Sequence, residues 1–299
     1  MLSRWASVYA MAWVPGVSVG GVVSATTVVI TGGTQGLGFG YARECLKRGC
    51  RVVISGRERS RVEAAVQRLR ESIPEAASSI VGTDAEVADL ASVQALWDFA
   101  ARQWGRVDIW IHNAGYARTG ETFLNNQAED IEAMVRTNVV GSINAAQVVV
   151  AGMRTQGGGR LYLTLGGGGG TGRLVPGMTV YSTTKRAVKY LVKSLLKERK
   201  EANDGILIGT ISPGINLTEG MMREMAKLTP QQRERGLKQL NFIGDHVETT
   251  TPWIIDRVLQ DTRQGNEIVW LSSGRLARRS LAMLFGQKRD VLSRYALEK

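Results

Sequence analysis

The chain has 299 residues, of which 43% are hydrophobic and 22% charged, which excludes a low-complexity chain and suffices for one large α/β domain. Its formal net charge of +11 favours an anionic partner, but no nucleic-acid-binding motif accompanies the charge, so no nucleic-acid partner is predicted. With two cysteines and two histidines, the sequence predicts no metal site, no disulfide framework and a reducing compartment.

Residues 1–25 precede the first regular pattern. Arg4 is their only charged residue, and no acidic residue appears before Glu44. An acid-poor, moderately apolar stretch of this kind predicts a targeting or membrane-associating leader. Pro15 and three glycines argue against a spanning helix, and a flexible extension is the alternative.

From Thr26 onward, short β-branched or apolar runs alternate with helical patterns. This alternation predicts parallel βαβ units and therefore a Rossmann-type, three-layer α/β fold with a doubly wound parallel sheet, in a single domain over residues 26–272. The expected strands are 26–31, 51–55, 80–83, 107–112, 160–165 and 206–211. After a first helix ending near residue 46, the expected helices are 58–72, 90–104, 128–154 and 181–199.

The first expected strand ends in a glycine-rich turn that leads into a helix. Such a turn lets backbone amides approach a pyrophosphate at the positive end of the helix dipole. The expected cofactor-binding residues here are Gly32, Thr34, Gln35, Gly36, Leu37 and Gly38. After the second strand, Ser55 and Arg57 stand where an NAD site places a carboxylate, so the sequence predicts NADPH, whose 2′-phosphate a guanidinium can bind.

Tyr181 and Lys185 are four residues apart in an expected helix, which places the phenol and the ammonium on one face. A phenol of pKa near 10 is a poor catalyst at neutral pH, and the neighbouring ammonium is expected to lower that pKa. Tyr181 is therefore predicted to give a proton to a carbonyl oxygen as hydride arrives from the nicotinamide, while Lys185 also holds the nicotinamide ribose.

These motifs together resemble the short-chain dehydrogenase/reductase family over roughly residues 26–272. The matching segments are Thr31–Gly38, Asp84-Ala85, Asn113-Ala114-Gly115, Asn138, Tyr181 with Lys185, and Pro213-Gly214. The resemblance implies a nicotinamide cofactor whose adenine lies between Asp84 and Ala85. It also implies that Asn113, followed by Ala114 and Gly115, steadies the sheet beside that cofactor.

The same resemblance assigns roles nearer the reacting atoms. Asn138 would hold a water in a proton relay from Lys185, and Pro213, Gly214 and Thr218 would border the nicotinamide. Dimers or tetramers would form through the helices at 128–154 and 181–199, so a homo-oligomer is expected.

One family feature is missing, the serine just after the fifth strand that hydrogen-bonds the substrate carbonyl. Positions 166 and 168 are both glycine, within the run Gly166–Gly170. Losing a hydroxyl that stabilises a developing oxyanion commonly costs about 10²–10³ in rate. Thr171, or alternatively Thr164, is expected to replace it. The remaining alternatives are backbone amides of the glycine run, or an NADPH-binding sensor or scaffold impaired in catalysis.

Within the family, the chain resembles the chlorophyll b reductases. The similarity rests on Asp108–Ile111 before His112–Gly115, the glycine run, Thr184-Lys185-Arg186, Ser212-Pro213-Gly214 and a basic tail. It implies NADPH-dependent reduction of the formyl group of chlorophyll b to hydroxymethyl in chlorophyll catabolism, in a chloroplast or at the thylakoid. The alternative is a steroid, 3-ketoacyl or general carbonyl reductase, cytoplasmic or peripheral to a membrane.

A bulky apolar substrate agrees with two features of the expected site. The segment 215–242, where this fold places a mobile lid, carries Met221, Met222 and Met225, whose flexible side chains adapt to a large flat ligand. The glycine run would leave room for a bulky ring. Methionines that pack against the body of the protein are the alternative.

Residues 273–299 form a basic tail with a net charge of +5. Its apolar residues are Leu276, Leu281, Met283, Leu284 and Phe285, among others. The pattern predicts a basic amphipathic helix that makes a peripheral contact with an anionic membrane surface. A solvated helix or a subunit contact is the alternative.

Overall fold

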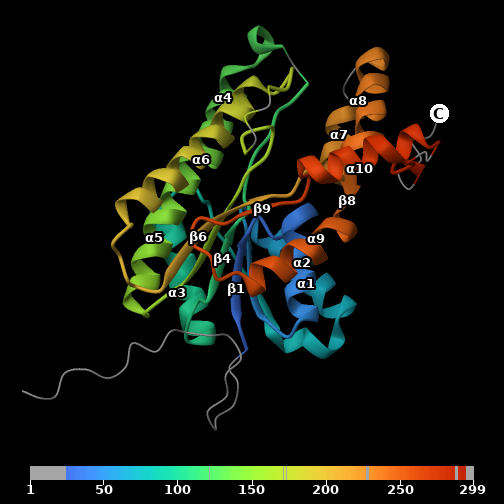
Figure 1. Cartoon of the computed structure of the whole chain (residues 1–299). Coiled ribbons are helices and arrows are strands. Elements are labelled where there is room, and N and C mark those ends of the chain that lie inside the picture. Colours follow the sequence, from blue (N-terminus) through green and yellow to red (C-terminus); the bar gives the residue numbers. More distant parts are fainter. Residues whose placement is uncertain are drawn as a thin grey trace, which may run out of the picture.

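Seven parallel strands form the central sheet of the computed structural model, which describes residues 25–293 apart from 121, 171, 173, 227–228 and 287–288 (Figure 1). The order across the sheet is β3-β2-β1-β4-β5-β6-β9. The strands are β1 (Thr27–Thr31), β2 (Arg51–Gly56), β3 (Ile80–Asp84), β4 (Ile109–His112), β5 (Gly159–Thr164), β6 (Ile206–Ser212) and β9 (Glu267–Val269). The predicted doubly wound sheet is confirmed, whereas the expected leader lies almost wholly outside the described residues.

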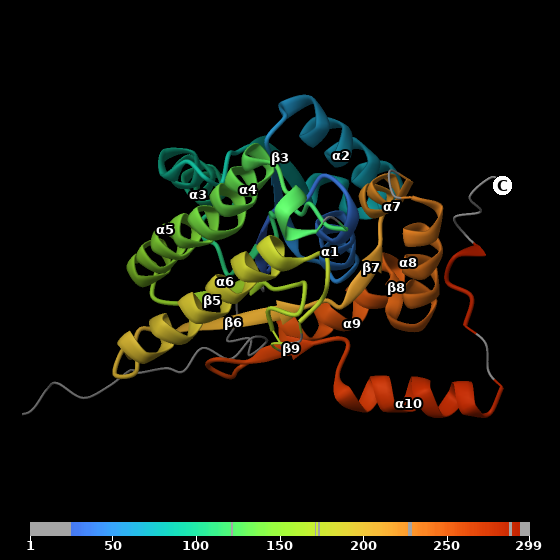
Figure 2. The ribbon, with the colours of Figure 1, turned by 90° about the horizontal axis from the view of Figure 1, so that it is seen from above.

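Helices cover both faces of this sheet, as Figure 2 shows. On one face lie α1 (Gly36–Lys47), α2 (Arg59–Ser72) and α9 (Val247–Gln260), which share a core with Ile30 and Ile54. On the other face lie α3 (Leu90–Trp104), α5 (Gly141–Thr155) and α6 (Thr179–Glu198), which pack on Val29, Trp110 and Leu163. Successive strand residues point to opposite faces, so each strand feeds both cores and must be apolar along its length.

Short local signals set the ends of several helices. The Asp89 carboxylate accepts from the backbone amide of Ala91 and caps α3, and Gly105, at φ +84°, ends the same helix. The long helix expected over 128–154 is divided, because a π-helical turn, Arg136–Val140, separates α4 (Ala128–Val135) from α5. Such turns are often found at functional sites, and this one contains Asn138.

The chain beyond β6 builds a cover over one side of the carboxyl-terminal edge of the sheet. It comprises β7 (Ile215–Leu217), α7 (Glu219–Ala226), α8 (Pro230–Ile243) and β8 (Gly244–His246), and β7 pairs with β8. Figure 1 shows α7 and α8 rising opposite α4 and α6. After β9 the chain forms α10 (Ser273–Leu284), which confirms the helix predicted for the tail over those residues. Within the described segments, every helix falls short of the length and apolar character needed to cross a bilayer.

Candidate active site

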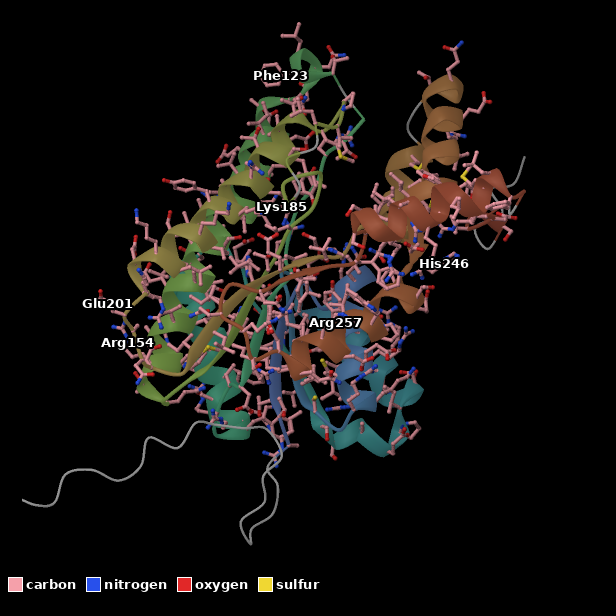
Figure 3. The ribbon with its side chains drawn as sticks, viewed as in Figure 1. Phe123, Arg154, Lys185, Glu201, His246 and Arg257 are labelled. Atoms are coloured by element: carbon pink, nitrogen blue, oxygen red, sulfur yellow. The ribbon has the colours of Figure 1, made fainter. Side chains whose placement is uncertain are left out.

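The order of the strands reverses next to β1, which pairs with β2 on one side and β4 on the other. In open parallel sheets, ligands bind at such a point, outside the carboxyl ends of the strands. The glycine-rich turn follows β1 and Asn113 follows β4, so both predicted motifs lie at this edge. Figure 3 places Lys185 at the same edge, between α6 and the sheet.

The turn after β1 is shaped to admit an anion close to its backbone. A Cβ at Gly38 would lie 2.1 Å from the carbonyl oxygen of Gly32, and Gly32 itself has φ +65°. The side chain of Gln35, the residue before α1, makes no capping hydrogen bond, so it leaves the first-turn amides of that helix open. Across the turn, the Thr218 methyl group lies 3.2 Å from the Cβ position of Gly36. These features fit a dinucleotide pyrophosphate.

Polar groups gather at the ends of β2 and β3. The hydroxyl of Ser55 is buried and has no hydrogen-bond partner among the described residues. Arg57 is exposed, and its guanidinium forms no hydrogen bond or ion pair with the described residues. The carboxylate of Asp84 instead lies 3.6 Å from Arg59, a residue that the sequence analysis missed, and the Ala85 amide donates to Gly56. Arg57 is therefore the cation left available for a 2′-phosphate.

Thr31 joins β4 to the glycine-rich turn. Its hydroxyl oxygen accepts from the backbone amides of Asn113 and Ala114, at 3.1 and 3.0 Å. With both lone pairs occupied, it donates its proton to Nδ1 of His112, 3.2 Å away. Burial, and then the charge of Lys185, lower the pKa of His112 to about 3, so this imidazole is neutral. The side-chain amide of Asn113 donates to the carbonyl oxygens of Thr31 and Gly32, which agrees with its expected structural role.

Tyr181 and Lys185 share one face of α6, but burial dominates both of their pKa values. The Lys185 ammonium donates to the carbonyl oxygen of Thr164 at 3.0 Å and lies 5.8 Å from the centre of the Tyr181 ring. Burial raises the pKa of Tyr181 to about 12 and lowers that of Lys185 to about 8. The phenol pKa is therefore shifted in the direction opposite to the prediction, because loss of hydration on burial disfavours the phenolate.

Asn138 organises the segment that follows β4. Its side-chain oxygen accepts from the Tyr116 amide at 2.8 Å, and its side-chain nitrogen donates to the Tyr116 carbonyl at 2.8 Å and to the Thr184 hydroxyl at 2.9 Å. A Cβ at Gly115 would lie 3.3 Å from the Asn138 oxygen and 3.4 Å from the Lys185 nitrogen. Gly115 thus separates the two side chains that the family's relay would connect, and the relay itself stays a prediction.

The glycine run packs tightly against α6. A Cβ at Gly166 would lie 2.6 Å from the Tyr181 hydroxyl oxygen. The side chains of Ser182, Arg186 and Lys189, spaced along α6, donate to the carbonyl oxygens of Gly167, Gly169 and Gly170. Gly166 itself offers no free space, because the phenol occupies the place where a serine side chain would begin. The expectation that the run leaves room for a bulky ring stays a prediction.

Of the two threonines expected to replace the serine, the structure describes only Thr164. Thr171 lies outside the described residues. The hydroxyl of Thr164 is buried without a partner in the described structure, but Thr164 alternates with Leu163 and Leu165, which pack under α6. Its side chain therefore points to the face of the sheet away from Tyr181, and Gly166 is the residue that faces the phenol.

The residues expected to border the nicotinamide lie at the end of β6 and beneath the cover. Gly214 adopts φ +73°, the Pro213 carbonyl accepts from Asn216 at 2.8 Å, and the Thr218 hydroxyl accepts from the Met221 amide at 3.2 Å. Met222 and Met225 are buried, and Met222 packs against Leu217. These two methionines therefore pack against the body of the protein.

A protein-family model described as short chain dehydrogenase matches residues 26–229. The chain belongs to the short-chain dehydrogenase family. A relative named as a probable chloroplastic chlorophyll(ide) b reductase, from Oryza sativa subsp. japonica, is 31% identical over 289 residues, 88% of this chain and 56% of that protein. A 3alpha-hydroxysteroid dehydrogenase from Mediterraneibacter gnavus is 32% identical over 191 residues, 64% of this chain and 74% of that protein.

Solved structures share this fold. A variant of the actinorhodin polyketide ketoreductase, solved with NADPH, superposes with a TM-score of 0.72 at 21% identity, over 84% of this chain and 97% of that one. The chain spans slightly more than half the length of the plant relatives it matches. The resemblance seen in the motifs is thus confirmed at the level of family and fold.

Proposed function

We propose that this protein is an NADPH-dependent reductase that converts a formyl or keto group to an alcohol. The observation that carries the proposal is the position of the Tyr181 phenol. It lies against Gly166, on the same helix face as Lys185 and at the sheet edge that also holds the glycine-rich turn. When bound, the nicotinamide supplies the hydride. The chain supplies the proton and holds the reacting carbonyl in place.

The protonation states of the two side chains favour reduction. A phenol of pKa about 12 keeps its proton at neutral pH, so Tyr181 can donate it from its hydroxyl to a carbonyl oxygen that gains negative charge. Lys185, with a pKa of about 8, exchanges protons near neutrality and can return one to the phenolate. The Cβ position of Gly115 lies 3.3 Å from the Asn138 oxygen and 3.4 Å from the Lys185 nitrogen, the two groups that the family's water relay would join.

NADPH is the proposed cofactor because of the groups at the end of β2. The Arg57 guanidinium is exposed and the Ser55 hydroxyl lacks a partner among the described residues, whereas the nearby Asp84 carboxylate lies against Arg59. A 2′-phosphate could accept hydrogen bonds from both Arg57 and Ser55. Asp84 does not offer a free carboxylate for a 2′-hydroxyl, because it already lies against Arg59. The solved ketoreductase with NADPH supports the same choice.

Chlorophyll b, reduced at its formyl group in a chloroplast, is the proposed substrate. Support comes from the plant relative's name and from large apolar side chains in the loops that follow β4 and β5. Phe123 and Leu124 follow β4 and Leu174 follows β5, and they are 60%, 90% and 92% exposed. A hydrogen bond from the Gly120 amide to the Gly177 carbonyl joins the two loops. A steroid is the second candidate, favoured by the steroid dehydrogenase relative.

Exposed apolar residues on the outer helices support a homo-oligomer. Val135 on α4, Val140 in the π-helical turn, Ile143 on α5 and Tyr190 on α6 are all exposed. They lie on the two helices through which the family resemblance implies subunit contacts. We include this assembly, and the division into a domain over 26–272 and a tail over 273–299, in the proposal.

The test combines the purified protein with NADPH and chlorophyll b in mild detergent and follows the pigment by absorbance and chromatography. We expect the hydroxymethyl pigment to form, and Tyr181→Phe to slow turnover by about 10²–10⁴ because the proton donor is lost. NADPH binding, measured by fluorescence, should survive that change. Tyr190→Phe, on the exposed side of the same helix, is the matched control and should keep full activity.

Other outcomes separate the alternatives. Reduction of steroids or small ketones without any conversion of chlorophyll b would reject the pigment and retain the reductase. NADPH binding with no reduction of any carbonyl would favour the sensor. Full turnover by Tyr181→Phe would reject the assigned mechanism for every substrate.

A further inference from the structure

Helix α10 is inverted relative to an ordinary surface helix. None of its residues is buried, and Figure 2 shows it at the edge of the molecule, apart from the layers that cover the sheet. An amphipathic surface helix normally turns its apolar face to the protein and its charged face to water. In α10, charged side chains face the protein and large apolar side chains face outward.

Two arginines, with Leu276 and Ala282, make up the partly covered inward face of α10. Arg275 donates to the Trp270 carbonyl at 2.8 Å, and its guanidinium lies 3.6 Å from the centre of the Trp270 ring. One turn later, a single guanidinium nitrogen of Arg279 donates to both carboxylate oxygens of Asp245, at 2.8 and 2.6 Å. Both arginines therefore anchor the helix to the body of the protein.

Asp245 holds this arrangement together. It is 4% exposed and also accepts from the Trp270 indole at 2.7 Å and from Arg289, beyond the helix, at 2.8 Å. Arg279 and Arg289 make further bonds to carbonyl oxygens of the α8–β8 junction. Turning the charged face outward would leave a buried carboxylate without its cations, which is strongly unfavourable. The apolar face is consequently held toward the outside.

Four large apolar side chains are exposed at the carboxyl end of α10, the last of them just beyond the helix. Leu281, Met283, Leu284 and Phe285 are 55%, 53%, 83% and 78% exposed. Contiguous apolar patches larger than a few hundred Å² on a soluble protein mark protein or membrane contacts. A stable dimer buries about 800 Å² on each partner, which a single short helix face does not supply. Four side chains at one end of a short helix are therefore better suited to insertion into a lipid surface than to holding two copies together.

The charges around the patch select the kind of surface. Arg278 is exposed beside the apolar face and makes no recorded hydrogen bond or ion pair within the described chain. Besides burial, Arg275 feels the positive charges of Arg278, Arg279 and Arg257 and the single negative charge of Asp245. Basic groups flanking an apolar helix face bind negatively charged lipid headgroups.

We propose that the outward face of α10 docks this protein peripherally on an anionic lipid bilayer. Leu281, Leu284 and Phe285 enter the boundary between headgroups and acyl chains, and Arg278 contacts the headgroups. The proposal holds for whichever substrate the reductase takes. Because the Asp245 cluster ties α10 to β8 in the cover over the site, docking also fixes the cover's orientation relative to the bilayer.

Vesicle flotation of the full chain tests the proposal. The vesicles are phosphatidylcholine alone, and phosphatidylcholine with a third of the lipid replaced by phosphatidylglycerol. We expect binding to the second kind only, weakened by salt because screening shortens the reach of Arg278. Replacing both Leu284→Glu and Phe285→Glu should reduce the bound fraction at least about tenfold, since two apolar side chains that enter the bilayer are exchanged for charged ones.

A second variant and a control complete the experiment. Arg278→Glu should lower binding to anionic vesicles while circular dichroism stays unchanged. Leu90→Glu replaces an exposed leucine at the start of α3, on another part of the surface, and should bind like the native chain. Reductase turnover on a soluble carbonyl should be the same for all four proteins.

Three results would overturn the proposal. The first is native protein that ignores anionic vesicles at low salt. The second is equal flotation of the native chain and the Leu284→Glu, Phe285→Glu double variant. The third is native oligomer that falls to monomer in this double variant by light scattering while vesicle binding is absent throughout, which would make the face a contact between copies of the chain.

Discussion

At the residue scale, the Tyr181 phenol occupies the space that a side chain at position 166 would need. The Cβ position of Gly166 lies 2.6 Å from the phenol oxygen, well inside contact distance, so any side chain at 166 must displace the reacting group. Gly166, which stands where the family usually has a serine, is therefore what allows the phenol to lie in its present position. Placing a serine at position 166 is therefore not expected to increase catalysis in this chain.

Gly166→Ser is accordingly expected to lower turnover at least about tenfold, because a displacement of about 1 Å at a reacting group can cost 10² in rate. Steady-state kinetics on the best carbonyl substrate is the measurement. Gly166→Ala is the matched control, since it adds the Cβ without a hydroxyl and should be impaired to a similar degree. A serine variant faster than the native protein would show instead that the hydroxyl is what the site lacks.

The charged, buried side chain of Lys185 is expected to lower the free energy of unfolding at neutral pH. Burial lowers its pKa from 10.5 to about 8, so between those values the unfolded chain binds more protons than the folded chain. Stability therefore rises with pH from about 8 to 10.5, and below pH 8 the full cost of the buried charge is present. That cost is about 3 kcal/mol, less about 1 kcal/mol for the hydrogen bond to Thr164.

Lys185→Met should then raise the free energy of unfolding by about 2 kcal/mol at pH 7, while turnover is lost, and the advantage should vanish near pH 10. Urea denaturation at the two pH values measures both effects. Lys193→Met, at an exposed position of the same helix, should show no such dependence on pH. A Lys185→Met protein less stable than native at both values would contradict the assignment of a costly buried charge.

At the scale of elements, the cover over the site and α10 depend on one buried carboxylate. Asp245 is in β8, accepts from Trp270 at the end of β9 and pairs with Arg279 of α10. β8 in turn pairs with β7, which follows the residues expected to border the nicotinamide. A substitution at Asp245 is thus expected to disturb the packing of β8, β9 and α10, which are separate in the sequence.

Asp245→Asn should release α10 and loosen the cover. Removing one partner of a buried ion pair costs about 3–5 kcal/mol, because the remaining charges stay buried and uncompensated. Limited proteolysis should cut within residues 273–285 much faster than in the native chain. Asp256→Asn removes the half-exposed partner of Arg48 and should cost less than about 1 kcal/mol. Equal proteolysis of the native and Asp245→Asn proteins would show that α10 is held by other contacts.

The π-helical turn is a second feature of this scale. Residues 128–154 have the apolar spacing of a continuous helix, and no proline or glycine pair marks the break at Arg136–Val140. The extra residue in that turn accompanies three hydrogen bonds that the Asn138 side chain makes with Tyr116 and Thr184, one accepted and two donated. These partners are 22 and 46 residues away, so a local pattern carries no signal of them.

At the scale of the whole molecule, topology brings the site together. The glycine-rich turn, Asn113 and the glycine run follow β1, β4 and β5, which are adjacent in the sheet although far apart in the chain. Because parallel strands end at one edge, residues after three strands converge without any long-range motif. The family and its fold could therefore be predicted from the order of strands, helices and motifs.

What the sequence by itself determined is the set of elements and their chemistry. Alternating apolar runs specify a covered parallel sheet, and Tyr181 with Lys185, four apart in a helix, must share a face. Only the tertiary structure decided the direction of their pKa shifts, the contact between Gly166 and the phenol, and the outward turn of α10. Each of these depends on burial and on partners far away in the chain, and neither quantity is encoded in local periodicity.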